Sequence, residues 1–288
     1  MTIGAQAAPH VRRPRKRSVP LAVVLAVSAL AVFLILPFAG LIARVTPAVL
    51  LARLAAPDTL RALGLSLVTS LVATGTVVLL GTPAAYLLAT RDFPGKRWLE
   101  VLIALPMVLP PTVAGFALLM AFGRLGIAGQ ALQGLGITLP FTTAGVVLAQ
   151  VFMAAPFFIA PARAGFASVD RRYLDAAATL RGSEALRFRR VMLPLAMPAL
   201  AAGVSMSAAR ALGEFGATIT FAGNLPGVTQ TMPLAVYVAL QSDLDQAVVL
   251  SVLLLAMSLG LLMGVRWAPQ GWMRMRDDAG HPDSTPAR

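Results

Sequence analysis

The chain has 288 residues, of which 58% are hydrophobic and 12% are charged, and its mean hydropathy is +0.79. This composition excludes a soluble globular protein and indicates an integral membrane protein. The sequence contains no cysteine, and its two histidines, His10 and His281, lie in polar tails, which leaves no thiolate or histidine metal site and no catalytic triad built on histidine or cysteine.

Six apolar segments are predicted to cross the membrane, because about 20 helical residues span the hydrocarbon core and a charge at mid-depth is costly. In chain order they lie between Arg17 and Arg44, between Arg61 and Arg91, between Glu100 and Arg124, from about Phe141 to Arg163, from about Val191 to Phe221, and between Asp245 and Arg266. The stretch LGIAGQALQGLGITLP at 125–140 is too rich in glycine to form a span. The predicted fold class is therefore an all-α, polytopic membrane protein with about six transmembrane helices.

The first apolar segment has a rival interpretation, because a basic cluster precedes it as in a signal peptide. The apolar run is much longer than the roughly 7 to 15 residues of a signal-peptide core. A retained first span is therefore favoured over a cleaved leader.

The positions of lysine and arginine predict the orientation, because these residues concentrate on the cytoplasmic side. Most of them fall in the N-terminal tail, at 91–97, at 163–190 and in the C-terminal tail, and few fall at the opposite ends of the spans. Both termini are thus expected in the cytoplasm, with a basic tail at 1–18, a transmembrane domain at 19–267 and a polar tail at 268–288. The net charge of +12 follows from topology and does not indicate a nucleic-acid partner.

Prolines are frequent within the predicted spans, where each removes a backbone donor and disturbs the helix. Two interpretations stay open: the prolines only shape the packing, or the third to fifth spans line a path that opens and closes. The prolines concerned are Pro106, Pro110, Pro111, Pro156, Pro161, Pro194 and Pro198.

An arginine-rich loop at 165–190 separates the fourth and fifth segments and is predicted to form two short helices. Asp175 lies early in the first helix, Gly182 breaks it, and Ser183 caps a second helix that has Glu184 in its first turn. The alanines at 176–178 form a smooth face that permits close approach. The loop therefore predicts either a docking element or a positive surface lying on anionic lipid.

Within this loop, DAAATLRGSEALRFRRVMLP (175–194) resembles the cytoplasmic signature of the permease subunits of binding-protein-dependent ABC importers. That signature is Glu-Ala-Ala, three residues, Gly, nine residues, Ile, any residue, Leu-Pro. Asp175 replaces its glutamate, Arg181 stands at its glycine position, with Gly182 one residue later, and Val191 replaces its isoleucine. The resemblance implies the permease fold of a type I importer and a coupling loop that docks on a separate ATPase through Asp175, Ala176, Ala177, Arg181, Gly182, Leu193 and Pro194.

A second motif, ARALGEFGATITFAGNLPGVTQTMPLAVY (209–237), resembles the molybdate permease pattern within that family. Sulfate permeases share only its Gly-Glu-Phe-Gly part, so a sulfate or thiosulfate permease is the alternative. The resemblance covers most of the chain from about residue 60 onward. It implies import of molybdate, or of tungstate, from a periplasmic or extracellular binding protein.

Arg210 and Glu214 stand four residues apart on the fifth segment and can pair. Three interpretations stay open: a structural or gating ion pair, direct contact with the passing oxyanion, or a hydrated interfacial position for Glu214. The predicted pathway or gate residues are Arg210, Gly213, Glu214, Phe215, Gly216, Thr218 and Thr220. Weak contacts to an oxyanion would come from Ser205, Ser207, Thr218, Thr220 and Asn224, unless these side chains bond to their own helix backbone.

The chain has no Gly-x-x-x-x-Gly-Lys-Ser/Thr phosphate loop, so a primary ATPase within this chain is excluded. A secondary transporter would need more buried acids or inverted repeats, and a membrane enzyme would need a converging catalytic set. The resemblance implies a non-catalytic subunit with no cofactor of its own, while the partner ATPase binds ATP and Mg²⁺. It implies a homodimer with two ATPase subunits and one binding protein, in the bacterial inner membrane and in contact with its lipid.

Overall fold

The computed structural model describes residues 20–54, 56–179 and 183–279, and all regular elements among them are helices. The chain separates into two compact units, Met1–Arg44 and Val45–Arg288. The first unit contains α1 (Leu21–Ala43), a helix of 23 residues with a hydropathy of 2.8 and no charged side chain. Its length and composition suit a membrane span.

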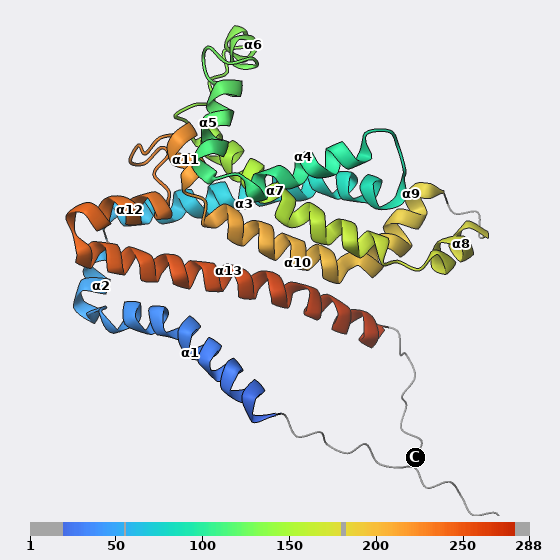
Figure 1. Cartoon of the computed structure of the whole chain (residues 1–288), viewed down its shortest axis with the longest axis horizontal. Coiled ribbons are helices and arrows are strands. Elements are labelled where there is room, and N and C mark those ends of the chain that lie inside the picture. The colour runs from blue at the N-terminus through green and yellow to red at the C-terminus, as the bar shows by residue number, and fades with distance from the viewer. Residues whose placement is uncertain (1–19, 55, 180–182, 280–288) are drawn as a thin grey trace, which may run out of the picture. The chain divides into compact units, whose positions relative to one another are not determined.

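The second unit contains the remaining helices (Figure 1). In chain order they are α2 (Pro47–Leu54), α3 (Pro57–Thr90), α4 (Lys96–Val108), α5 (Pro111–Phe122), α6 (Gly129–Gly134), α7 (Thr143–Ala167), α8 (Arg171–Thr179), α9 (Glu184–Arg187), the π-helical turn Phe188–Met192, α10 (Leu193–Leu212), α11 (Gly216–Phe221), α12 (Met232–Ser242) and α13 (Leu244–Ala279).

Five helices in the described part of the chain are long and apolar enough to cross a membrane: α1, α3, α7, the continuous helix Glu184–Leu212, and α13 over Leu244–Gly264. The polytopic all-α class is thereby confirmed, but the expected third span, between Glu100 and Arg124, forms two shorter helices, α4 and α5. The physical reason is the pair Pro110–Pro111, because a residue before proline is driven into an extended conformation. Leu109 and Pro110 both adopt it, with ψ of 136° and 132°.

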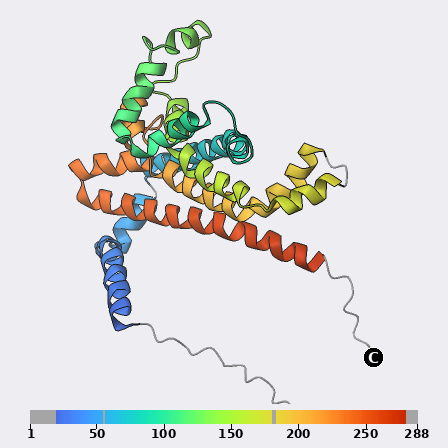
Figure 2. The same cartoon turned by 45° about the vertical axis from the view of Figure 1, so that its right-hand side comes forward.

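The central core of the second unit is formed by α3, α7 and α10, which lie side by side in Figures 1 and 2. Phe158 of α7 is fully buried at its centre. A Cβ on Gly81 of α3 would lie 2.8 Å from the Phe158 ring, and one on Gly203 of α10 would lie 3.0 Å from the Phe158 carbonyl oxygen. Small residues therefore set the separation of these helices, as in other membrane helix bundles.

Two further clusters surround this core. Ala149 and Met153 of α7 pack with Ala217 and Phe221 of α11 and with α5, and Ala62 of α3 packs with α12 and α13. Figure 1 shows α8 and α9 at one end of α10 and α11 at its other end. The segment 125–140, expected not to form a span, contains only the short helix α6 and loops.

Candidate coupling and transport sites

The first part of the predicted coupling loop is helix α8. Asp170 precedes it, and its side-chain oxygen accepts a hydrogen bond from the Arg172 backbone N–H at 2.9 Å, which stabilises the start of the helix. Asp175, Ala176 and Ala177 all lie on α8, where Asp175 is exposed and Ala177 is half-buried.

Helix α8 is described up to Thr179 and α9 begins at Glu184, so the break expected at Gly182 is not tested by the described residues. Arg181 and Gly182 lie outside the described residues. The predicted cap of the second helix is confirmed, because Ser183 Oγ accepts a hydrogen bond from the Leu186 backbone N–H at 3.3 Å.

Helix α9 continues into α10 through the π-helical turn Phe188–Met192, so that Glu184–Leu212 is one uninterrupted helix. The prediction of a separate second short helix, with the fifth span starting near Val191, was therefore wrong. Leu193 and Pro194, the last predicted coupling residues, lie in the first turn of α10 and are half-buried. Proline cannot donate to the carbonyl four residues earlier, and its ring crowds that carbonyl. The wider π-helical turn directly before Pro194 accommodates this conflict without ending the helix.

Two residues at the end of α3 contact the start of α9. Arg91 Nη2 lies 2.5 Å from Glu184 Oε1, and the Tyr86 hydroxyl donates to the same oxygen at 3.3 Å. From the sequence, Arg91 was interpreted as the border of a span and as one of the cytoplasmic basic residues, and Glu184 as an acid in the first turn of a helix. Nothing in the sequence pairs residues this far apart.

At the other end of α10, Arg210 Nη2 lies 2.5 Å from Glu214 Oε2. The Glu214 side chain is fully buried and that of Arg210 is 22% exposed. Glu214 Oε1 accepts a hydrogen bond from the Ala217 backbone N–H at 2.7 Å. The predicted ion pair within the chain is confirmed, and Glu214 occupies a buried position in place of a hydrated interfacial one.

The chain bends between α10 and α11 because the helix ends at Leu212 and restarts at Gly216. Gly213 is exposed at the bend, while the Phe215 ring lies 5.0 Å from the ring of Tyr237 on α12, measured between centroids. The predicted fifth span therefore consists of a long helix, this bend and a short helix.

Helices α5 and α11 approach each other through two glycines. A Cβ on Gly216 would lie 2.6 Å from Cβ of Pro111, and one on Gly115 would lie 2.6 Å from the Ala217 carbonyl oxygen. Gly216 thus holds a packing role at the bend that its sequence motif alone did not reveal.

The hydroxyl groups proposed for oxyanion contact divide into two kinds. Ser205 Oγ and Thr220 Oγ1 donate to backbone carbonyls of their own helices, those of Ala201 and Gly216, each at 2.9 Å. Among the described residues, the fully buried hydroxyls of Ser207 and Thr218 have no hydrogen-bond partner, and the same holds for Asn224 Oδ1. Bonding to the helix backbone is thus observed for Ser205 and Thr220 and is not observed for Ser207 and Thr218.

Two polar contacts between helices, one buried and one half-buried, were not predicted from the sequence. Ser66 Oγ on α3 accepts a hydrogen bond from the Met232 backbone N–H at 2.7 Å, where α12 begins. Arg163 of α7 forms an ion pair at 2.9 Å with Glu100 of α4. Both join helices that are distant in sequence, and only the fold brings them together.

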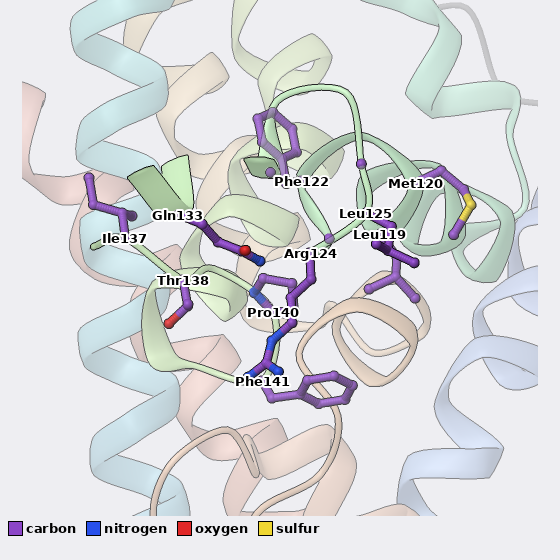
Figure 3. Close-up of a pocket in the computed structure, with 13 residues that line it drawn as sticks. Leu119, Met120, Phe122, Arg124, Leu125, Gln133, Ile137, Thr138, Pro140 and Phe141 are labelled. Atoms are coloured by element: carbon purple, nitrogen blue, oxygen red, sulfur yellow. The ribbon is translucent and has the colours of Figure 1, made fainter. Parts of the chain in front are cut away.

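A cavity of about 730 Å³ lies between the end of α5, α6 and the loop that leads into α7 (Figure 3). Its walls are mostly apolar, and Arg124 is the one charged residue among those that line it. Gln133 and Thr138 supply further polar side chains, as Figure 3 shows. No residue predicted from the sequence as a coupling or pathway residue lines this cavity.

Comparison with known proteins assigns these features to a family. Residues 78–265, well over half of the chain, match the model of the binding-protein-dependent transport system inner membrane component. The chain is similar to the molybdenum transport system permease protein ModB of Mycobacterium tuberculosis, with 42% identity over 234 residues that cover 81% of this chain and 89% of the relative.

A second relative, ModB of Escherichia coli, is also 42% identical, over 159 residues that cover 55% of this chain and 69% of the relative. Among solved structures, a bacterial ABC transporter involved in alginate import matches with a TM-score of 0.71 at 13% identity, covering 86% of this chain and 94% of the matched chain. At that identity the likeness shows the fold, which is that of an ABC importer permease. The chain belongs to the family of inner-membrane components of binding-protein-dependent transport systems.

Proposed function

We propose that this protein is the transmembrane subunit of an ATP-driven importer that moves molybdate, or its close analogue tungstate, into the cytoplasm. The observation that carries the proposal is the 42% identity, over 81% of this chain, to a molybdenum transport system permease. The chain is the permease component and does not itself catalyse a reaction. ATP and Mg²⁺ bind to the partner ATPase.

The working assembly has two copies of this chain, two ATPase subunits and one substrate-binding protein on the outer side. The family is defined by its dependence on a binding protein, which supports the outer partner. One copy supplies one half of a pathway, and a twofold axis between two copies completes it. Lipid covers the exposed apolar side chains of the outer helix faces.

The segment α8–α9 docks on the ATPase at the cytoplasmic face. Both tails, 1–18 and 268–288, lie on that same side, in agreement with the distribution of lysine and arginine along the sequence. The docking surface is formed by Asp175, Ala176 and Ala177 on α8, with Arg181 and Gly182 following in the chain and Leu193 and Pro194 at the start of α10.

Helix α10 connects this docking segment to the bend at Glu214. Its 20 residues extend about 30 Å at 1.5 Å per residue. Because α9 and α10 form one continuous helix, displacement of α9 by the ATPase also displaces Arg210 and the bend. The segment Gly213–Gly216 and the hydroxyls of Thr218 and Thr220 then line or gate the pathway, where weak contacts allow the anion to leave again.

Competitive uptake tests the proposed substrate. The permease, its ATPase and its binding protein are reconstituted in vesicles, and uptake of radiolabelled molybdate is measured with excess unlabelled tungstate or sulfate. ATP-dependent uptake that tungstate suppresses and sulfate leaves intact supports the proposal. Suppression by sulfate at equal concentration would assign the chain to sulfate transport, and uptake without the ATPase would refute the importer mechanism.

A further inference from the structure

A single carboxylate oxygen joins the start of α9 to the end of α3. Glu184 Oε1 lies 2.5 Å from Arg91 Nη2 and accepts a hydrogen bond from the Tyr86 hydroxyl at 3.3 Å. Glu184 is the first residue of α9, and Arg91 directly follows α3. These three residues form what we call the α3–α9 contact.

An aromatic cluster supports this contact from the side of the core. The Tyr86 ring lies 4.9 Å from that of Phe188 in the π-helical turn and 6.0 Å from that of Phe166 on α7, measured between centroids. Phe166 is 2% exposed and belongs to the central core. The Tyr86 hydroxyl is therefore held at a fixed position by rings from two other elements.

A movement of α9 can therefore be passed directly to two membrane helices. The first is α10, which is continuous with α9. The second is α3, whose Ser66 accepts the hydrogen bond from Met232 at the start of α12. A displacement of α3 can therefore be passed to α12. Helix α12 also contacts the bend after α10, through the rings of Tyr237 and Phe215.

On this basis, and resting on the proposed function, we propose that the α3–α9 contact is a second transmission point between the ATPase and the membrane helices. Arg91 and Glu184 are positioning residues, and they make α3 follow α9 when the docking segment moves. Their side chains are 58% and 56% exposed, so their ion pair contributes little to the stability of the fold. Loss of the ion pair is expected to reduce the movement that α9 passes to α3, while the protein still folds.

Charge exchange tests the proposal in the reconstituted complex. Arg91→Glu and Glu184→Arg each place like charges in contact, whereas the double variant Arg91→Glu/Glu184→Arg restores an opposite pair. Each single variant is expected to lower molybdate uptake per ATP hydrolysed by roughly two- to fivefold, the range of a weak exposed pair. The double variant is expected to recover most of this loss, while co-purification of the ATPase stays unchanged throughout.

Arg97→Glu is the matched control, because Arg97 is an exposed arginine in the first turn of α4, close to Arg91 in the chain, and the described structure gives it no ion pair. This variant should take up as much molybdate per ATP hydrolysed as the unaltered protein. Unchanged ratios in both single variants, or a double variant no better than the singles, would overturn the proposal. Loss of ATPase co-purification in the singles would also overturn it, since the contact would then serve docking.

A measurement independent of the substrate separates this inference from the proposed function. The sequence has no cysteine, so Arg91→Cys/Glu184→Cys introduces the only thiols of this chain, and cross-linking within the chain is read from its own band. Because only the tips of the two side chains touch, the cysteines are joined with a bifunctional thiol reagent long enough to replace both side chains. The yield of this cross-link in membranes containing the complex is expected to change when ATP is bound, and a measurable yield that stays constant would contradict movement at the contact. Failure of molybdate uptake by the unaltered complex would instead refute the proposed substrate and leave this cross-linking result standing.

Discussion

Arg210 and Glu214 form an ion pair of 2.5 Å at the point where α10 ends, and the glutamate is fully buried. The second carboxylate oxygen of Glu214 accepts the Ala217 N–H at the start of α11. One side chain therefore neutralises the arginine and also satisfies a free helix N-terminus. This double role links the position of α10 to that of α11.

Glu214→Gln separates the two roles, because glutamine can still accept the Ala217 hydrogen bond but cannot neutralise Arg210. Breaking a buried ion pair from one side costs roughly 3–5 kcal/mol, and the partial exposure of Arg210 offsets part of this. We expect a lower melting temperature in detergent and at least a tenfold loss of uptake. Both are measured on the purified complex.

The paired control is Arg210→Met/Glu214→Gln, which removes both charges. It should recover thermal stability, because no unpaired charge remains buried. Uptake that also recovers would show that the pair is only structural, whereas uptake that stays low assigns it a part in transport. Normal uptake and normal stability in the single variant Glu214→Gln would show that the ion pair is needed neither for stability nor for transport.

Gly216→Ala is expected to destabilise the bend, because the added Cβ would lie 2.6 Å from Cβ of Pro111 on α5. Overpacking of this kind costs roughly 1–3 kcal/mol. The melting temperature should fall. Gly75→Ala on α3 is the control, because nothing lies within 4 Å of its added Cβ. Equal melting temperatures for the two variants would contradict the close packing of α5 on α11.

Ala177→Arg should block docking of the ATPase on α8, because a long charged side chain cannot enter a surface that fits alanine. We expect ATP-coupled uptake and ATPase co-purification to be lost while the protein remains in the membrane. Ala131→Arg on α6 makes the same chemical change at an exposed site of the α5–α6 segment and should retain the ATPase. Uptake that survives Ala177→Arg would refute docking at this helix.

Ser66→Ala should destabilise the junction of α3 and α12, because the buried Met232 N–H loses its acceptor. An unsatisfied buried donor costs roughly 1–3 kcal/mol. Ser70→Ala, one turn later on α3, is the control, because the Ser70 hydroxyl only donates to a carbonyl of its own helix. Equal melting temperatures for Ser66→Ala and Ser70→Ala would show that the hydrogen bond from Met232 to Ser66 contributes little to stability.

Hydropathy and charge placement alone were enough to predict the membrane class and four of the long helices at close to their observed limits. Local chemistry also predicted the Ser183 cap and the pairing of Arg210 with Glu214, since both depend on residues within one helical turn. The third predicted span was wrong as a single helix. Pro110 and Pro111 were expected to disturb the helix, but the hydropathy of a segment does not show whether its backbone is interrupted, and here α4 ends before these prolines and α5 begins at the second.

Other features were decided only by the tertiary structure. The contact of Arg91 with Glu184, the hydrogen bond from Met232 to Ser66 and the packing of Gly216 on Pro111 join residues far apart in the chain. Each depends on how helices are placed against one another, and that placement follows from close packing of small residues across the whole bundle. The sequence by itself determined which segments are apolar enough to enter a membrane and which loop resembles the coupling signature, because transfer of side chains into lipid is a local property. Which helices move together is a collective property, and only the assembled fold defines it.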